Sequence, residues 1–147
     1  MAAILRALTP IQKLWRDKAS TNHQTVGSTG ESVAARYLLN RGYFMLHRNS
    51  RNRLGEIDLV MEAPDKRTIV FVEVKTAESK PDPRLAPELR VGSKKQQKLT
   101  ALAANYLRKN GLIRQPVRFD VVGVNLPVDE EDEPQVRHYA NAFQSPW

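Results

Sequence analysis

Two strand-like segments, residues 55–60 and 70–75, most constrain what this chain folds into. They have the sequences GEIDLV and VFVEVK, so each is rich in branched and aromatic residues and each carries acids within an apolar run. Because side chains alternate along a strand, Glu73 and Lys75 leave one face while the valines around them take the other. A carboxylate and an ammonium group among valines are costly to keep dry. They are accounted for if they hold a cation and act on a charged substrate.

The first half of the compact region predicts a helix followed by three strands. A capping box begins at Ser28, apolar residues follow at helical spacing, and Gly42 supplies a left-handed end. Strands are expected over residues 43–49, 55–62 and 68–76. Turn residues separate the last two, which predicts an antiparallel hairpin.

A long helix is expected in the second half of the chain. It would follow a proline-rich loop over residues 77–91, begin at Ser93 with a capping box to Gln96, and end at Gly111. Its apolar stripe consists of Leu99, Leu102, Ala103, Tyr106 and Leu107.

A fourth strand is predicted over residues 118–124, reached through this helix. A strand–helix–strand connection of that length favours parallel neighbours. Residues 135–143 would add an edge strand. The predicted fold class is therefore α/β, a mixed sheet in the order α-β-β-β-α-β flanked by helices.

The charge balance favours a polyanionic partner. The 147 residues include 23 Lys and Arg against 16 Asp and Glu, a formal charge of +7. Five of the acids stand together at residues 129–133, so the rest of the chain is more basic still. A basic domain attracts nucleic acid by releasing its counterions. The alternative is that Lys and Arg serve only solubility.

Other features limit the protein class. The chain has no cysteine, which excludes disulfides and thiolate metal sites, and it has no apolar run of membrane-spanning length. The start of the chain lacks the features of a signal peptide, so a cytoplasmic protein is expected. His23, His47 and His138 fit no ligand spacing and are expected at the surface.

The motifs GEID at residues 55–58, FVEVK at 71–75 and RFDVV at 118–122, in this order, resemble the YraN-like family of small bacterial proteins. That resemblance implies a restriction-endonuclease-like fold related to archaeal Holliday junction resolvases. It divides the chain into an N-terminal extension with a short helix over residues 1–27, a nuclease-like domain over 28–125, and an acidic loop with an edge strand over 126–147.

The resemblance also implies a nuclease core of the PD-(D/E)xK type. In that core Asp58 and Glu73 bind a divalent cation, Mg²⁺ or Mn²⁺, Glu31 completes the metal site, and Lys75 lies beside the attacking water. The chain departs from the pattern at Ile57, which stands where the proline of the motif would be. It also lacks the Gln-x-x-x-Tyr signature of related exonucleases.

The chemistry of carboxylates agrees with a divalent-cation site, but each acidic residue also has another explanation. Mg²⁺ prefers carboxylate oxygens, and two such groups close together without a cation repel each other, so at least one pKa should rise. Glu31 could instead serve only its capping box. Asp58 and Glu73 could be solvent-facing charges on an antiparallel sheet. Glu56 shares a face with Asp58, but its place at the strand start suggests an exposed or supporting group.

The basic residues expected to contact nucleic acid fall into two groups: Arg48, Arg51 and Arg53 before the second strand, and Lys94, Lys95 and Lys98 at the start of the long helix. The favoured function is a Mg²⁺-dependent endonuclease acting on branched or processed DNA, with a homodimer as one arrangement. The alternative is a catalytically inactive module that binds nucleic acid or another protein.

Overall fold

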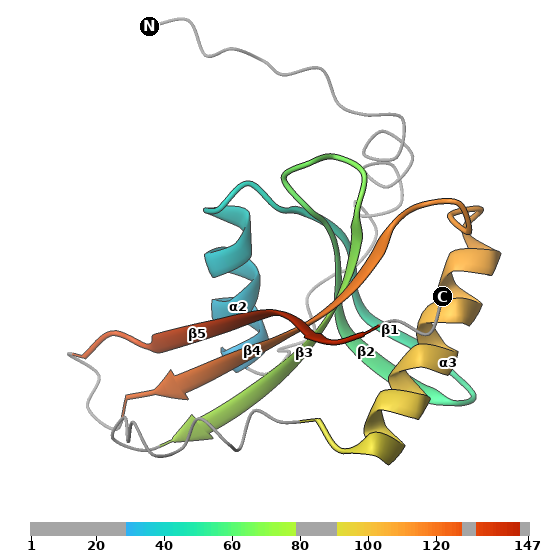
Figure 1. Ribbon diagram of the computed structural model, residues 1–147. Helices are drawn as coiled ribbons and strands as arrows, with labels where there is room; N and C mark the ends of the chain where they lie inside the picture. The colour runs from blue at the N-terminus through green and yellow to red at the C-terminus, as the bar shows by residue number, and fades with distance from the viewer. Residues whose placement is uncertain (1–28, 79–90, 128–131, 145–147) are drawn as a thin grey trace, which may run out of the picture.

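The computed structural model describes residues 29–78, 91–127 and 132–144 (Figure 1). The predicted N-terminal helix, Ser28, His23 and most of the loop over residues 77–91 lie outside these ranges. The elements follow in the order α2 (Thr29–Leu39), β1 (Phe44–Asn52), β2 (Gly55–Glu62), β3 (Ile69–Glu78), α3 (Ser93–Lys109), β4 (Val117–Leu126) and β5 (Gln135–Phe143).

The strands form a single five-stranded mixed sheet in the order β1-β2-β3-β4-β5. β2 pairs with β3 in an antiparallel hairpin, and β3 pairs with β4 in parallel over its whole length, as the sequence predicted. β5 is the expected antiparallel edge strand. This α/β architecture is consistent with the predicted restriction-endonuclease-like core.

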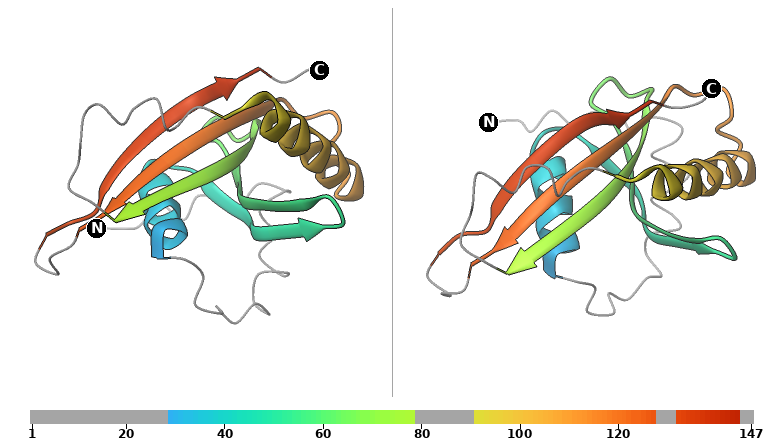
Figure 2. Two further views of the ribbon diagram at one scale, coloured as in Figure 1. Left: turned by 90° about the horizontal axis from the view of Figure 1, so that it is seen from below. Right: turned by 60° about the horizontal axis from the view of Figure 1, so that its bottom comes forward.

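The two helices cover opposite faces of the sheet, and the two views of Figure 2 show α2 and α3 on different sides of the strands. Alternation along β3 explains the layers. Phe71 packs in a core with the apolar stripe of α3, whereas Val70 and Val72 pack in a second core with Ala34 and Leu38 of α2. All five residues of the predicted α3 stripe are buried.

β2 and β3 separate at the point where the chemistry was predicted. Their pairing runs only from Glu62 and Ile69 to Leu59 and Val72. Beyond Val72, β3 no longer pairs with β2 and pairs only with β4. The hairpin of β1 and β2 swings toward α3 while β3 and β4 run the other way (Figure 1). Asp58 is the first residue of β2 beyond the paired region, so it lies at this fork.

The helix boundaries confirm two predictions and correct one. Gly42 and Gly111 adopt left-handed backbone conformations, with φ of +89° and +68°, after α2 and α3. The predicted capping box at Ser93 is wrong. Extended backbone at Gly92 makes that residue the N-cap, so α3 begins with Ser93 already inside the helix and no side chain caps it. Gln96 instead donates its side-chain amide to the Val91 carbonyl at 2.7 Å.

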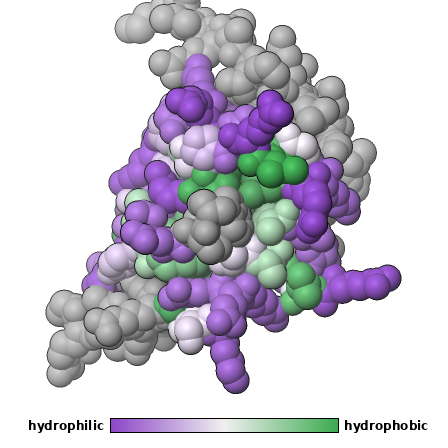
Figure 3. Space-filling view, turned by 45° about the vertical axis from the view of Figure 1, so that its right-hand side comes forward, coloured by the Kyte–Doolittle hydropathy of each residue, from purple (hydrophilic) through white to green (hydrophobic). Residues whose placement is uncertain are grey.

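The outer surface around α3 is mostly hydrophilic, with hydrophobic side chains in smaller areas (Figure 3). In the described ranges, neither helix combines the length and apolarity that crossing a membrane requires.

Candidate metal and nucleic-acid site

Asp58 bridges the fork between β2 and β3. Its Oδ2 accepts a hydrogen bond of 2.8 Å from the backbone N–H of Val74, a donor that β2 no longer reaches. Burial raises the pKa of Asp58 to about 7, and the negative charges of Glu73 and Glu31 add to the rise, which the Val74 bond opposes. The sequence analysis expected repulsion between carboxylates to raise a pKa, whereas here burial is the larger cause and the neighbouring charges add to it.

Glu31 and Glu56 approach Asp58 closely. Each of the three residues offers one carboxylate oxygen, and these oxygens all lie within 4.8 Å of one another. Glu31 comes from the first turn of α2, which packs tightly on β3 at Gly30, where an added Cβ would overlap the side chain of Thr76. The small residue at position 30 thus lets α2 bring Glu31 to the fork.

Asn49 joins two of these carboxylates. With its amide nitrogen facing them, it donates to Glu56 Oε1 at 2.7 Å and to Glu31 Oε2 at 2.9 Å. Asn49 lies opposite Asp58, because its neighbours Arg48 and Ser50 pair with residues on either side of Asp58 in β2. Its φ is +54°, a left-handed conformation that asparagine tolerates well. No role in the site was predicted for Asn49.

Glu73 and Lys75 extend from β3 on the face toward α3. Glu73 is largely buried, with 12% of its side chain exposed, pairs with Lys95, and adds to the raised pKa of Asp58. Lys75 follows two residues later and is half-buried. We refer to Glu31, Glu56, Asp58 and Glu73 as the acidic cluster. It contains the three predicted metal ligands together with Glu56, which is half-buried and closer to Asp58 than the sequence suggested.

Three of the predicted nucleic-acid contacts pair with this cluster. Arg51 Nε lies 2.8 Å from Glu56 Oε2, and Lys95 Nζ lies 3.0 Å from Glu73 Oε1. Arg48 Nε lies 3.8 Å from Glu31 Oε2, and its guanidinium also donates to Ser32 Oγ at 2.9 Å.

The other three behave differently. Lys98 packs its side chain against Gly55, at the start of β2. Arg53 and Lys94 are exposed and pair with no carboxylate in the parts of the chain that are described.

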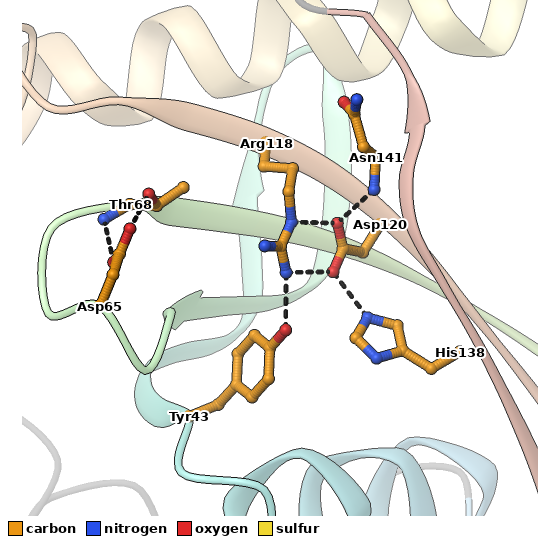
Figure 4. Close-up of polar contacts among 7 residues, drawn as sticks. All are labelled: Tyr43, Asp65, Thr68, Arg118, Asp120, His138 and Asn141. Carbon is orange, nitrogen blue, oxygen red and sulfur yellow. Dashed lines mark hydrogen bonds and ion pairs between the residues drawn. The ribbon is translucent and has the colours of Figure 1, made fainter.

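A separate buried ion network lies between β4, β5 and the start of β1 (Figure 4). Arg118 donates to both carboxylate oxygens of Asp120 at 2.8 Å and to the Tyr43 hydroxyl at 2.6 Å. His138 Nε2 lies 2.6 Å from Asp120 Oδ2, and the backbone N–H of Asn141 donates to Oδ1. Burial alone would raise the pKa of Asp120, but these hydrogen bonds outweigh it and lower the pKa.

Asp120 is the structural partner of a basic residue, Arg118. The expectation that the histidines lie at the surface is wrong for His138, which is largely buried with its ring edge-on to those of Tyr37 and Tyr43, and for His47, which is half-buried beside Tyr106. The pairing of β5 with β4 brings His138 to Asp120, and the spacing of these residues in the sequence does not indicate that contact.

Relatives of this chain match most of its length. A family model described as "Uncharacterised protein family UPF0102" matches residues 30–124. UPF0102 proteins of Trichlorobacter lovleyi and Pelobacter propionicus are 42% and 36% identical, over 82% and 86% of this chain and 91% and 87% of their own lengths. UPF0102 protein TTE1452 of Caldanaerobacter subterraneus subsp. tengcongensis is 40% identical over 83% of this chain and 97% of its own length.

Among solved structures, Pyrococcus furiosus SfsA in complex with Ca²⁺ is 16% identical, with a TM-score of 0.31 over 74% of this chain and 60% of that one. That likeness is too weak to support an argument. The family model spans most of the chain and the matched relatives are similar along nearly their whole lengths. The chain belongs to the uncharacterised protein family UPF0102, the YraN family that its motifs resemble.

Proposed function

We propose that this protein is a Mg²⁺- or Mn²⁺-dependent endonuclease that hydrolyses phosphodiester bonds in branched or processed DNA. The observation that carries the proposal is the convergence of Glu31, Glu56 and Asp58, whose carboxylate oxygens lie within 4.8 Å of one another at the fork of the sheet. Glu73 and Lys75 project from the adjoining strand.

The donor set fits a hard divalent cation. Within the described residues all candidate ligands are carboxylates, the groups that Mg²⁺ and Mn²⁺ take from proteins, with no histidine among them. Burial, with the charges of Glu73 and Glu31 added, raises the pKa of Asp58 to about 7, and a bound cation would favour its ionised form. Asp58 and Glu73, with Glu31 and Glu56 beside them, would hold the cation.

The chain's own residues then account for the rest of the chemistry. A bound Mg²⁺ would activate a water for attack and offset charge on the phosphate. Lys75, on the same face of β3 as Glu73, would orient the attacking water or stabilise negative charge that develops on phosphate oxygens. Exposed bases on the β1–β2 hairpin and at the start of α3 would hold the phosphate backbone without selecting sequence.

The direct test is incubation of the purified protein with branched and linear DNA, with Mg²⁺, with Mn²⁺ and with a chelator. Cleavage should require the cation and should disappear in Asp58→Asn. Asp65→Asn, an exposed acid in the β2–β3 turn, is the matched control and should cleave normally. Cleavage that survives Asp58→Asn would refute the proposal, and DNA binding without cleavage under any metal would favour a non-catalytic module.

A further inference from the structure

We propose that, without a cation, ion pairs with the acidic cluster keep Arg51 and Lys95 from DNA. A divalent cation on the cluster would release both bases to bind DNA phosphates. Cation and DNA would then bind cooperatively. This inference rests on the proposed function, because it assumes that the cation occupies the cluster.

The geometry makes these two bases different from their neighbours. Arg51 is 75% exposed and Lys95 48% exposed, so both reach solvent, yet each lies within 3.0 Å of a cluster carboxylate. Their partners, Glu56 and Glu73, are 31% and 12% exposed. Ion pairs with one exposed member are weak, so exchanging the carboxylate for a phosphate costs little.

Arg48 does not belong to this exchange. Only 23% of its side chain is exposed, its Nε is 3.8 Å from Glu31, and it also donates to Ser32. These contacts hold it in place between β1 and α2, so we expect it to support Glu31 whether or not a cation is bound.

Competition for the same carboxylate oxygens links the two binding events. Without a cation, the acidic cluster repels the DNA backbone and also occupies Arg51 and Lys95. A divalent cation on the cluster reduces the repulsion and leaves both bases available for phosphate oxygens. Because coupling between ligands is reciprocal, DNA should tighten cation binding by the same factor.

Two double variants provide a matched comparison. Arg51→Ala with Lys95→Ala removes the paired bases, and Arg53→Ala with Lys94→Ala removes one arginine of the same hairpin and one lysine of the same helix that lack such partners. DNA affinity would be measured by fluorescence anisotropy with and without Ca²⁺, the total ionic strength being matched with NaCl. Electrophoresis would verify that the DNA stays intact.

Ca²⁺ should tighten DNA binding by about tenfold in the unmodified protein and in the Arg53/Lys94 variant, and by less than about twofold in the Arg51/Lys95 variant. Equal tightening in both double variants would overturn the inference, because the charge lost is the same in each.

A second measurement needs no metal. Glu56→Gln should release Arg51, so DNA binding without a cation should tighten, and the slope of log K against log salt should steepen by about one. Both effects should vanish in an Arg51→Ala background and persist in an Arg53→Ala background. If both effects persist in the Arg51→Ala background as well, the loss of the Glu56 charge acts on DNA binding without Arg51, and the inference is contradicted.

Calorimetry separates the two proposals. If Ca²⁺ or Mn²⁺ binds the free protein but leaves DNA affinity unchanged, the coupling is refuted and the metal site stands. If no cation binds, the proposed function fails and the coupling fails with it.

Discussion

The carboxylate of Asp58 accepts the backbone N–H of Val74 at 2.8 Å, across the point where β2 and β3 part. A strand that leaves its neighbour exposes backbone donors, and here a side chain satisfies one of them. The same bond fixes the orientation of Asp58 beside Glu73. The fork and the acidic cluster are therefore parts of one arrangement.

The raised pKa of Asp58 predicts how stability depends on pH. Because the pKa of Asp58 is about 7 in the folded state and 3.8 in the unfolded chain, the folded protein binds more protons than the unfolded chain between these values. The free energy of unfolding should therefore fall as pH rises through this window. After allowance for solvent screening, we expect a decrease of about 1 to 2 kcal/mol, measurable by urea unfolding in chelator.

Asp58→Asn is the control for that prediction, because it removes the titrating group and keeps the acceptor oxygen. The difference in unfolding free energy between Asp58→Asn and the unmodified protein should grow in favour of the variant from about pH 4 to pH 7. Stability curves that stay parallel over this range would show that Asp58 titrates normally.

Asp120→Asn should be strongly destabilising. An amide in this place would turn an N–H₂ group toward Arg118 or His138 and leave the partly buried guanidinium of Arg118 without its carboxylate. We expect a loss of about 3 kcal/mol in the free energy of unfolding at neutral pH. Asp65→Asn, at an exposed turn, should cost much less.

The lowered pKa of Asp120 also predicts acid sensitivity. Its stabilising contribution is fully present above the unfolded pKa of 3.8 and is lost as pH falls through the lower folded value. The cost of Asp120→Asn should accordingly shrink in strong acid. A cost that is constant with pH would assign the effect to packing instead of charge.

Gly30→Ala tests how α2 positions Glu31. The added Cβ would collide with Thr76 on β3, so α2 must move away from the sheet. We expect a loss of about 1 to 3 kcal/mol in stability and weaker cation binding. Gly92→Ala is the matched control, since a Cβ there meets nothing within 4 Å. Equal stability of the two variants would show that α2 accommodates the change.

Lys75→Met should separate binding from chemistry. The substitution keeps the length of the side chain and removes its charge, while the acidic cluster stays intact. We expect cleavage to fall by about 10² to 10⁴-fold with calorimetric Mn²⁺ binding retained. Loss of cation binding together with cleavage would place Lys75 among the groups that hold the cluster in shape.

Most of the fold could be predicted from the sequence because the turn residues, the helix ends and the alternation of side chains along the strands were clear. The hairpin, the parallel crossover, the α3 stripe and the edge strand all followed from patterns within a few residues of each other. The cap at Ser93 failed because Ser93 and Gly92 are both acceptable N-cap residues, and only the backbone conformation decides between them.

The site was predictable in part for a similar reason. Asp58, Glu73 and Lys75 stand out as charges in apolar strands, and Glu31 through the family resemblance. Asn49 and the exact place of Glu56 depend on the turn of β1 and β2 at the fork, which no spacing rule encodes. The pairing of Arg51 and Lys95 with the cluster depends on contacts between distant segments, and so does the burial of His138.

If the acidic cluster binds a divalent cation, calorimetric titration of Mn²⁺ into the metal-free protein should show saturable binding near neutral pH. This binding should weaken as pH falls below about 7, because protons compete for Asp58, and it should be lost in Asp58→Asn but retained in Asp65→Asn. Absence of binding to the unmodified protein, or equal binding to Asp58→Asn, would contradict the proposed metal site.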